Sequence, residues 1–371
     1  MAGYAPAREL SRRVELLRRF DLWLFASAAL LLVVGLLALY SVERSTPGST
    51  FFKRQVLRVA VGAVPFALFV LVDPRIWRRY ALTLYIINAS LLGLVLLKGK
   101  SGGGAQRWLQ FGPLDFQPSE LAKLFVVLTL AAFLFSRMDR IKSFSTFALS
   151  FLHVLIPLLL VFKQPHLGTT LVIVVAWLSV CLAAGVRLRY LAAAVLVVVL
   201  GLTLAMRVSG VLPKYQRERV KALLDPNTKG NAYQALQAQI AFGVGGLTGE
   251  GFLKGDQKVP EQQNDFIFTV VGEEGGLVGC TLVLLAFGFF FYRIWLIMVQ
   301  AEDPFYRMVT AGIFGILAFH TVVNLGMNLQ LLPVVGLWLP FMSYGGTAIW
   351  LCMACVAILL NMRSRQRPVL F

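Results

Sequence analysis

The carboxylate of Asp265 stands where a polar stretch of the chain meets an apolar one. It follows the polar segment 260–264 and precedes Phe266-Ile267-Phe268. A carboxylate in such a place can act as a general base if it lies within hydrogen-bond reach of the proton to be removed. The alternative is a helix cap, because Asp and Asn are both favourable there, and Asn264 is a second cap candidate. The residues alone leave both interpretations open.

A second group of candidates precedes another apolar run. Pro118 and Ser119 are typical first residues of a helix. Glu120 and Lys123 then lie three residues apart on one helix face and are predicted to form an ion pair. Arg107 lies a short way upstream. The pair either closes the end of the helix or contacts a substrate, and the sequence does not separate these interpretations.

A third group is the run of cations at 214–221, which contains Arg217 and Arg219. Charge runs of this kind are usually solvated loop surfaces. On a loop that lies against a membrane, however, guanidinium groups can bind a diphosphate headgroup through paired hydrogen bonds. The run is therefore a candidate anion site.

The other reactive side chains are predicted to be structural. His153 and His320 stand alone in apolar runs, as hydrogen-bonded interior residues do, and His166 is a weak candidate for a substrate contact. The four cysteines lack the second Cys or His pair that a metal site needs. No phosphate-binding loop and no HExxH motif occurs. We expect no organic cofactor and no metal site of these residues; the sequence leaves open whether a divalent cation takes part.

The elements that must position these residues are membrane spans. Of the 371 residues, 58% are hydrophobic and 14% charged, whereas soluble domains carry about 25% charged residues. A mean hydropathy of +0.75 indicates that the bilayer is the main solvent. The net charge of +17 does not indicate a nucleic-acid partner, because the basic residues lie between apolar runs, where charges orient membrane loops.

An all-α polytopic fold with ten transmembrane helices is predicted, as a single domain over residues 1–371. Each apolar run is long enough to cross a hydrocarbon core of about 30 Å. The uncharged run from 308 to 362 is divided by Pro333 and Pro340 into two spans joined by a loop that dips toward the membrane. The spans are expected at 22–42, 55–73, 76–97, 119–136, 144–163, 167–186, 189–208, 266–292, 308–330 and 345–362.

The loop charges predict how these helices are oriented. With a cytoplasmic N-terminus, the short cytoplasmic loops and the C-terminal tail carry about twice as many Lys and Arg residues as the opposite short loops. Both termini are then cytoplasmic, and the large loop 209–264 is extracytoplasmic. This loop is long enough to be functional. The apolar residues Tyr233, Leu236 and Ile240 predict an amphipathic helix at the membrane surface, followed by a glycine hairpin around 243–246.

Several motifs follow one another along the chain. They are GAQRWL at 104–109, FQPSELAK at 116–123, KQPHLGT at 163–169, YQRERV at 215–220, PEQ at 260–262 with DFIF at 265–268, GEE at 272–274 and LPFMSYGG at 339–346. In this order they resemble the SEDS family (shape, elongation, division and sporulation), the polytopic glycan polymerases of bacterial cell walls. Residues 20–23 and 251–255 resemble the elongation branch, RodA, more than the division branch, FtsW. His166 stands where the family usually has Asp, and Asn264 where Thr is commoner.

The resemblance implies an inverting glycosyltransferase that polymerises lipid II during cell elongation and shape maintenance. The acceptor 4-hydroxyl would attack C1 of the donor, form a β-1,4 bond and release undecaprenyl diphosphate. Asp265 would be the catalytic base, cations would neutralise the leaving diphosphate, and Glu120 would hold Lys123 in place. The expected substrate-binding residues are Lys123, Arg107, Glu120, Arg217, Arg219, Gln262 and Ser343.

The resemblance also implies partners in the bacterial plasma (inner) membrane. These are lipid II and the growing glycan strand, a class B penicillin-binding transpeptidase, other membrane proteins of the elongation complex, and the membrane lipids. The apolar outward faces of the last two spans are candidates for contact with the transpeptidase anchor, and the sequence does not show which face it uses. The alternatives are a division-branch polymerase and a flippase for the lipid-linked precursor. A flippase should have polar residues across the whole membrane depth, whereas here they cluster at one face.

Overall fold

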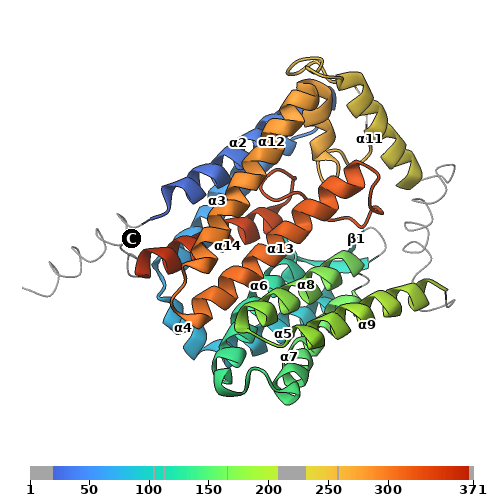
Figure 1. The fold of residues 1–371 in the computed structure, drawn as a ribbon. Coiled ribbons are helices and arrows are strands. Elements are labelled where there is room, and N and C mark those ends of the chain that lie inside the picture. Colours follow the sequence, from blue (N-terminus) through green and yellow to red (C-terminus); the bar gives the residue numbers. More distant parts are fainter. Residues whose placement is uncertain are drawn as a thin grey trace, which may run out of the picture.

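The computed structural model describes residues 20–102, 105–111, 114–164, 166–207, 231–256 and 259–366 and arranges them as a bundle of long helices (Figure 1). The long helices are α2 (Leu22–Ser45), α3 (Phe51–Leu71), α5 (Ala81–Lys98), α6 (Pro118–Phe135), α7 (Phe144–Lys163), α8 (Leu167–Ala184), α9 (Leu188–Arg207), α12 (Ile267–Val299), α13 (Pro304–Asn328) and α14 (Gly346–Arg365). In the described ranges nine of them can cross a membrane by length and composition, and α9 has a shorter apolar stretch. Each predicted span corresponds to one of these ten helices, so the polytopic all-α fold is confirmed.

Some predicted span boundaries were wrong by several residues. The span expected from 76 is two helices. One is the short α4 (Pro74–Arg79), whose N-cap Asp73 accepts a hydrogen bond from the Arg75 amide, and the other is α5, which begins only at Ala81. The span expected from 55 begins at Phe51, and α12 continues to Val299. A span predicted from uncharged residues stops at the first charged residue. The helix itself can continue, because long cationic side chains extend toward the membrane surface.

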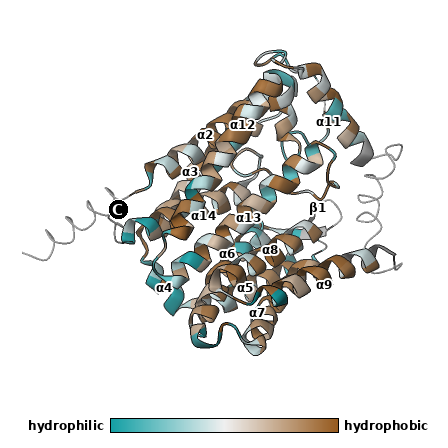
Figure 2. Ribbon diagram, in the orientation of Figure 1, coloured by the Kyte–Doolittle hydropathy of each residue, from teal (hydrophilic) through white to brown (hydrophobic). Residues whose placement is uncertain are grey.

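Ion pairs join helix ends on the side where the described chain begins and ends. They connect α2 with α12, the N-cap of α4 with α14, and α4 with the N-cap of α13. The pairs are Arg293–Asp21 at 2.6 Å, Arg365–Asp73 at 3.1 Å and Arg78–Asp303 at 3.7 Å. Figure 2 shows largely hydrophobic helices, with hydrophilic residues gathered at α4 and at loops.

The centre of the bundle is formed by α6, α13 and α14. In an apolar 18-residue stretch of each of these helices, 72%, 72% and 78% of the residues are buried, against 11% in α3 and 28% in α12. The last two spans, α13 and α14, therefore offer less outward surface than α3 or α12, and their role in holding a partner's anchor stays a prediction. The periodicity of a fully apolar helix does not show which side faces lipid, because core and lipid are equally apolar.

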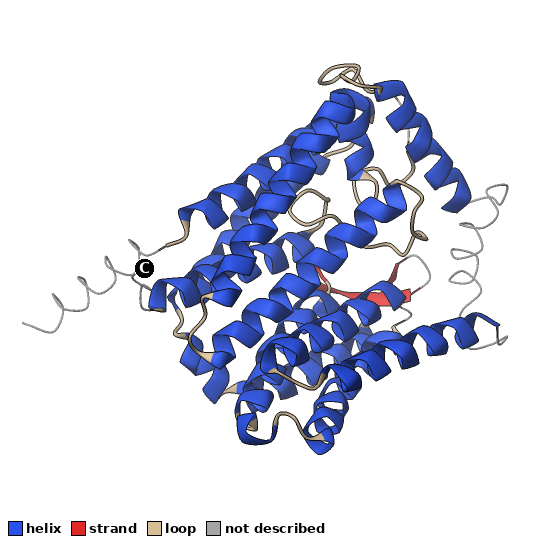
Figure 3. Cartoon of the chain, viewed as in Figure 1, coloured by secondary structure: helices blue, strands red, loops and turns tan. Residues whose placement is uncertain are grey.

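A small antiparallel sheet connects α5 to α6 at the other end of the bundle (Figure 3). Its strands are β1 (Lys100–Gly102), β2 (Ala105–Phe111) and β3 (Leu114–Phe116), in the order β1-β2-β3. Lys100 pairs with Trp108, and Leu109 pairs with Phe116. This sheet was not predicted from the sequence; two of its three strands have only three residues. Arg107 lies in its middle strand, β2, and β3 leads into the start of α6.

The large loop contains the predicted helix, α11 (Asn231–Gly245). Its small residues Ala238 and Ala241 are buried, whereas the bulky Tyr233, Leu236 and Ile240 are exposed. This is the arrangement expected of a helix whose apolar face lies on a membrane. Arg217 and Arg219 lie outside the described residues.

The expected glycine hairpin was wrong. Residues 246–251 instead form turns that bond to α12 at Gly276, where the helix is interrupted by a φ of 59°. The Leu277 amide donates to the Gly246 carbonyl at 2.9 Å, and the Glu250 amide donates to the Glu273 carbonyl at 3.0 Å. The interruption frees backbone groups of α12, and the glycine-rich turns satisfy them.

Residues 329–345 form the loop predicted between the last two spans, and it packs into the bundle. Leu337, Leu339 and Met342 are buried. A Cβ atom on Gly35 of α2 would lie 2.4 Å from the Met342 Cα, so this glycine permits the close approach of the loop.

Candidate active site

A cavity of about 300 Å³ lies at the end of the bundle that carries the sheet. It is formed by β2, the starts of α6, α8 and α14, the residues before α12 and the loop before α14. Its polar and aromatic lining residues are Arg107, Trp108, Gln117, Glu120, His166, Asn264, Asp265, Trp338, Tyr344 and Thr347. The fold thus brings Arg107 and Glu120, which are close in the sequence, to one cavity with the distant Asp265.

Asp265 is held in place through its backbone. Its carbonyl oxygen accepts hydrogen bonds from the side-chain amides of Asn324 at 2.8 Å and Asn328 at 2.9 Å. The Asn324 amide also donates to the carbonyl of Leu337, another cavity residue, at 2.7 Å. Both asparagines are fully buried in α13. Asp265 is partly exposed and lines the cavity, while its main chain is fixed by these bonds.

The predicted cap at the start of α12 was wrong for Asn264. The N-cap residue is Phe266, which makes no side-chain capping hydrogen bond. The Asn264 amide instead donates to the Glu261 carboxylate at 2.7 Å. Asp265 likewise precedes the N-cap position and lines the cavity, which weakens the capping interpretation of its carboxylate.

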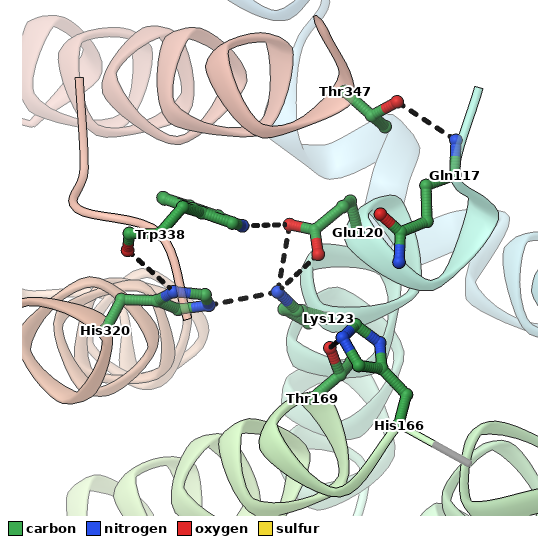
Figure 4. A network of polar contacts seen from close by, with 8 residues as sticks. All are labelled: Gln117, Glu120, Lys123, His166, Thr169, His320, Trp338 and Thr347. Atoms are coloured by element: carbon green, nitrogen blue, oxygen red, sulfur yellow. Dashed lines mark hydrogen bonds and ion pairs between the residues drawn. The ribbon is translucent and has the colours of Figure 1, made fainter. Parts of the chain in front are cut away.

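The predicted ion pair between Glu120 and Lys123 is present (Figure 4). The Lys123 ammonium donates to both carboxylate oxygens, each at 2.9 Å. Glu120 also accepts from the Trp338 indole nitrogen at 2.9 Å. Lys123 is 0% exposed and does not line the cavity, whereas Glu120 does. Lys123 was expected to face the substrate with Glu120 holding it in place. In the structure the Glu120 carboxylate faces the cavity and Lys123 lies behind it.

His320 completes this network from α13. Its Nε2 lies 3.0 Å from the Lys123 ammonium, its ring stacks on Trp338 with centroids 3.9 Å apart, and its Nδ1 lies 3.3 Å from the Trp338 carbonyl oxygen. His153 bonds Thr129 at 3.1 Å elsewhere in the core. Both histidines are interior and hydrogen-bonded, as predicted, but the link from His320 to the site was missed. One signal was available, because His320, Asn324 and Asn328 recur every fourth residue and form one polar stripe on an apolar helix.

Arg107 and His166 lie on the wall beside α8. The Arg107 Nε donates to the carbonyl of Gln164, the C-cap residue of α7, at 3.2 Å. His166 precedes the first residue of α8 and lies 3.4 Å from the Thr169 hydroxyl. Both line the cavity. The weak candidate His166 thus stands in the same cavity as the stronger ones.

Two predicted binding residues lie behind the wall instead. The Ser343 hydroxyl accepts from the Leu339 amide at 2.8 Å and closes the turn before α14, and Gln262 donates to the Thr269 hydroxyl at 3.3 Å. Both are buried and neither lines the cavity. Within the described part of the chain, no three His, Cys, Asp or Glu side chains come together to hold a metal ion.

Comparison with known proteins decides the family. Residues 17–368 match the family model described as "Cell cycle protein", which covers FtsW, RodA and SpoVE. The chain belongs to this family. A probable peptidoglycan glycosyltransferase FtsW from Geobacter sulfurreducens is 34% identical, over 96% of this chain and 99% of the relative. Peptidoglycan glycosyltransferase MrdB from Escherichia coli K12 is 35% identical, over 91% of both chains.

Solved structures of the FtsW/RodA/SpoVE family share the fold. A chain from a study titled "Structural coordination of polymerization and crosslinking by a peptidoglycan synthase complex" has a TM-score of 0.80 at 30% identity, covering 94% of this chain and 99% of that one. Thermus thermophilus RodA has a TM-score of 0.71 at 27% identity, covering 94% and 98%. The predicted SEDS membership is confirmed, and the protein is a glycosyltransferase of this family. The similar identities to FtsW and MrdB do not separate the division branch from the elongation branch.

Proposed function

We propose that the protein polymerises lipid II into β-1,4-linked glycan strands during cell elongation, with release of undecaprenyl diphosphate. The observation that carries this proposal is the single cavity in which Asp265, Glu120 and Arg107 meet. It combines a carboxylate that can accept a proton, a carboxylate that can bind sugar hydroxyl or amide donors, and a cation that can face a phosphate. Its residues belong to motifs spread over most of the chain.

Asp265 is the general base in this mechanism. Its carboxylate accepts the proton of the acceptor 4-hydroxyl while the hydroxyl oxygen bonds to C1 of the donor sugar and the bond from C1 to the diphosphate oxygen breaks. The two buried asparagines that hold the Asp265 carbonyl fix the distance of the base from the bound hydroxyl.

The leaving diphosphate requires cations. Arg107 is the arginine among the described residues that line the cavity, and Arg217 and Arg219 of the large loop are proposed to add to it. Lys123 acts through Glu120, because no part of the lysine is exposed. Gln262 and Ser343 are proposed to support binding by shaping the segments on either side of the cavity rather than by touching substrate.

The cavity is proposed to face the extracytoplasmic side, with both termini in the cytoplasm. The described chain begins and ends at the opposite end of the bundle, where the ion pairs of Asp21, Asp73 and Asp303 lie. Cysteine labelling in intact cells tests this. Thr248→Cys, next to α11, is expected to react with an impermeant maleimide, and Glu302→Cys, between α12 and α13, is expected to react only after lysis. Both positions are exposed, whereas the native cysteines are buried. Labelling in the opposite order would place the cavity in the cytoplasm.

An elongation role and a class B transpeptidase partner are proposed from two observations. Residues 20–23 and 251–255 resemble the elongation branch. A structure with 30% identity comes from a study of a complex that couples polymerization to crosslinking. Expression in bacteria depleted of their own elongation or division polymerase tests the role. Restored rod shape supports elongation, whereas restored septation alone supports the FtsW-like alternative.

Reconstitution with lipid II tests the activity itself. The protein is purified with its transpeptidase, supplied with lipid II, and the glycan product is resolved by length on a gel. Polymer is expected. The rival flippase would instead move lipid II across liposomes without forming polymer. The site residues favour the enzyme, since the cavity in the described ranges is built at one end of the helices rather than along their length.

A further inference from the structure

His320 is a buried residue with a contact to the candidate site but no contact to the cavity. We propose that His320, together with Trp338, is a positioning residue that holds the Glu120 carboxylate toward the cavity by means of Lys123. The proposal rests on the proposed polymerase function, because its effect on Glu120 is measured as glycan synthesis. It concerns the network of Figure 4, which joins α6, α13 and the loop before α14.

The hydrogen-bond donors of Lys123 are the first step of the argument. An ammonium group has three N–H donors and no acceptor. Three partners surround it, namely the two Glu120 oxygens at 2.9 Å each and the His320 Nε2 at 3.0 Å. Every donor is therefore used, and Lys123 is held with its charge directed at Glu120.

The tautomer of His320 follows from this geometry. Because the ammonium can only donate, Nε2 must accept, and a neutral imidazole that accepts at Nε2 carries its proton at Nδ1. Nδ1 lies 3.3 Å from the Trp338 carbonyl oxygen, which is an acceptor. One tautomer thus satisfies both contacts, and the ring bridges the lysine to the loop that forms the cavity wall.

Trp338 closes the network on the cavity side. Its ring stacks on His320, and its indole N–H donates to Oε2, one of the two Glu120 oxygens that accept from Lys123. Glu120 is therefore held from two directions, and both directions depend on the His320–Trp338 stack. Buried polar networks of this kind contribute more together than as separate pairs, provided that every member is satisfied.

Removal of the Nε2 acceptor should release Lys123. One ammonium N–H would then lack a partner in a site without exposed surface, and the lysine would move or draw Glu120 away from the cavity. Hydrogen bonds to charged groups are strong enough that this corresponds to about a tenfold to hundredfold loss of polymerisation. If His320 only filled space, polymerisation would not depend on its acceptor atom.

A matched pair of variants separates these cases. His320→Phe keeps a flat ring on Trp338 and removes the acceptor, whereas His320→Gln places an amide oxygen near the position of Nε2. With lipid II and the transpeptidase present, we expect the tenfold to hundredfold loss for His320→Phe and a rate within about threefold of the wild type for His320→Gln. His153→Phe is the control, because His153 is also interior but bonds Thr129 outside this network. Full activity of His320→Phe, or equal losses in both variants, would overturn the proposal.

A second measurement does not depend on the variants' activity. The chain has three histidines, so histidine-selective ¹⁵N labelling of the wild type gives few signals, and the loss of one in His320→Gln assigns it. We expect His320 as the neutral Nδ1–H tautomer. A proton on Nε2 would show that Lys123 does not donate to it and would overturn the proposal even if His320→Phe failed to fold. If the wild type made no polymer, the proposed function would fail while the tautomer would still test the network.

Discussion

Replacement of Asp265 by Asn is expected to reduce glycan polymerisation by about 10²–10⁴-fold with the fold retained. Asn keeps the size of the side chain and removes its capacity to accept a proton. The hydrogen bonds from Asn324 and Asn328 go to the backbone carbonyl, so the substitution leaves them in place. We therefore expect thermal stability and transpeptidase binding close to those of the wild type. The measurement is polymer yield from lipid II, with a melting curve of the same preparation.

Asp115→Asn is the matched control for this variant. Asp115 lies in β3 at the same end of the bundle, is exposed and does not line the cavity. The substitution makes the same change of charge, and near wild-type yield is expected. Near-normal polymer from a folded Asp265→Asn protein would be incompatible with its role as base. Glu120, the other carboxylate in the cavity, would then be the candidate, whereas Glu273 lies outside it.

The helices and one ion pair were predictable because each depends on neighbours in sequence. Long apolar runs predict spans whatever their packing. Pro118 and Ser119 mark a helix start, and three residues of spacing suffice to bring Glu120 and Lys123 together. The start of α6 is accordingly placed to within one residue. Starts that depend on capping, such as the start of α4 at Pro74 after its N-cap Asp73, were missed.

The orientation of the site could not be derived in the same way. Whether Glu120 or Lys123 faces the cavity depends on how α6 is rotated against α13 and the loop that carries Trp338, and these contacts join residues about 200 positions apart. The role of Asn324 and Asn328 depends on the same packing. Their spacing from His320 nevertheless marks a polar stripe in an uncharged run, and polar residues inside a span indicate a functional site by default.

Replacement of Lys123 by Met is expected to remove polymerisation and to destabilise the protein. The change leaves the Glu120 carboxylate, which is 3% exposed, without its cation. Breaking a buried ion pair from one side costs about 3–5 kcal/mol, because the remaining charge is left uncompensated. The melting temperature in detergent should fall together with the polymer yield. Lys98→Met, at an exposed position in the last turn of α5, should change neither.

The double variant Lys123→Met with Glu120→Gln distinguishes a structural ion pair from a functional carboxylate. Neutralising Glu120 removes the uncompensated charge, so the double variant should regain much of the stability that Lys123→Met loses. It should not regain polymerisation, because the cavity still lacks the carboxylate that Lys123, His320 and Trp338 hold in place. If activity returned with stability, the pair would serve only to close the end of α6, and substrate binding would depend on Arg107 and Asp265 alone.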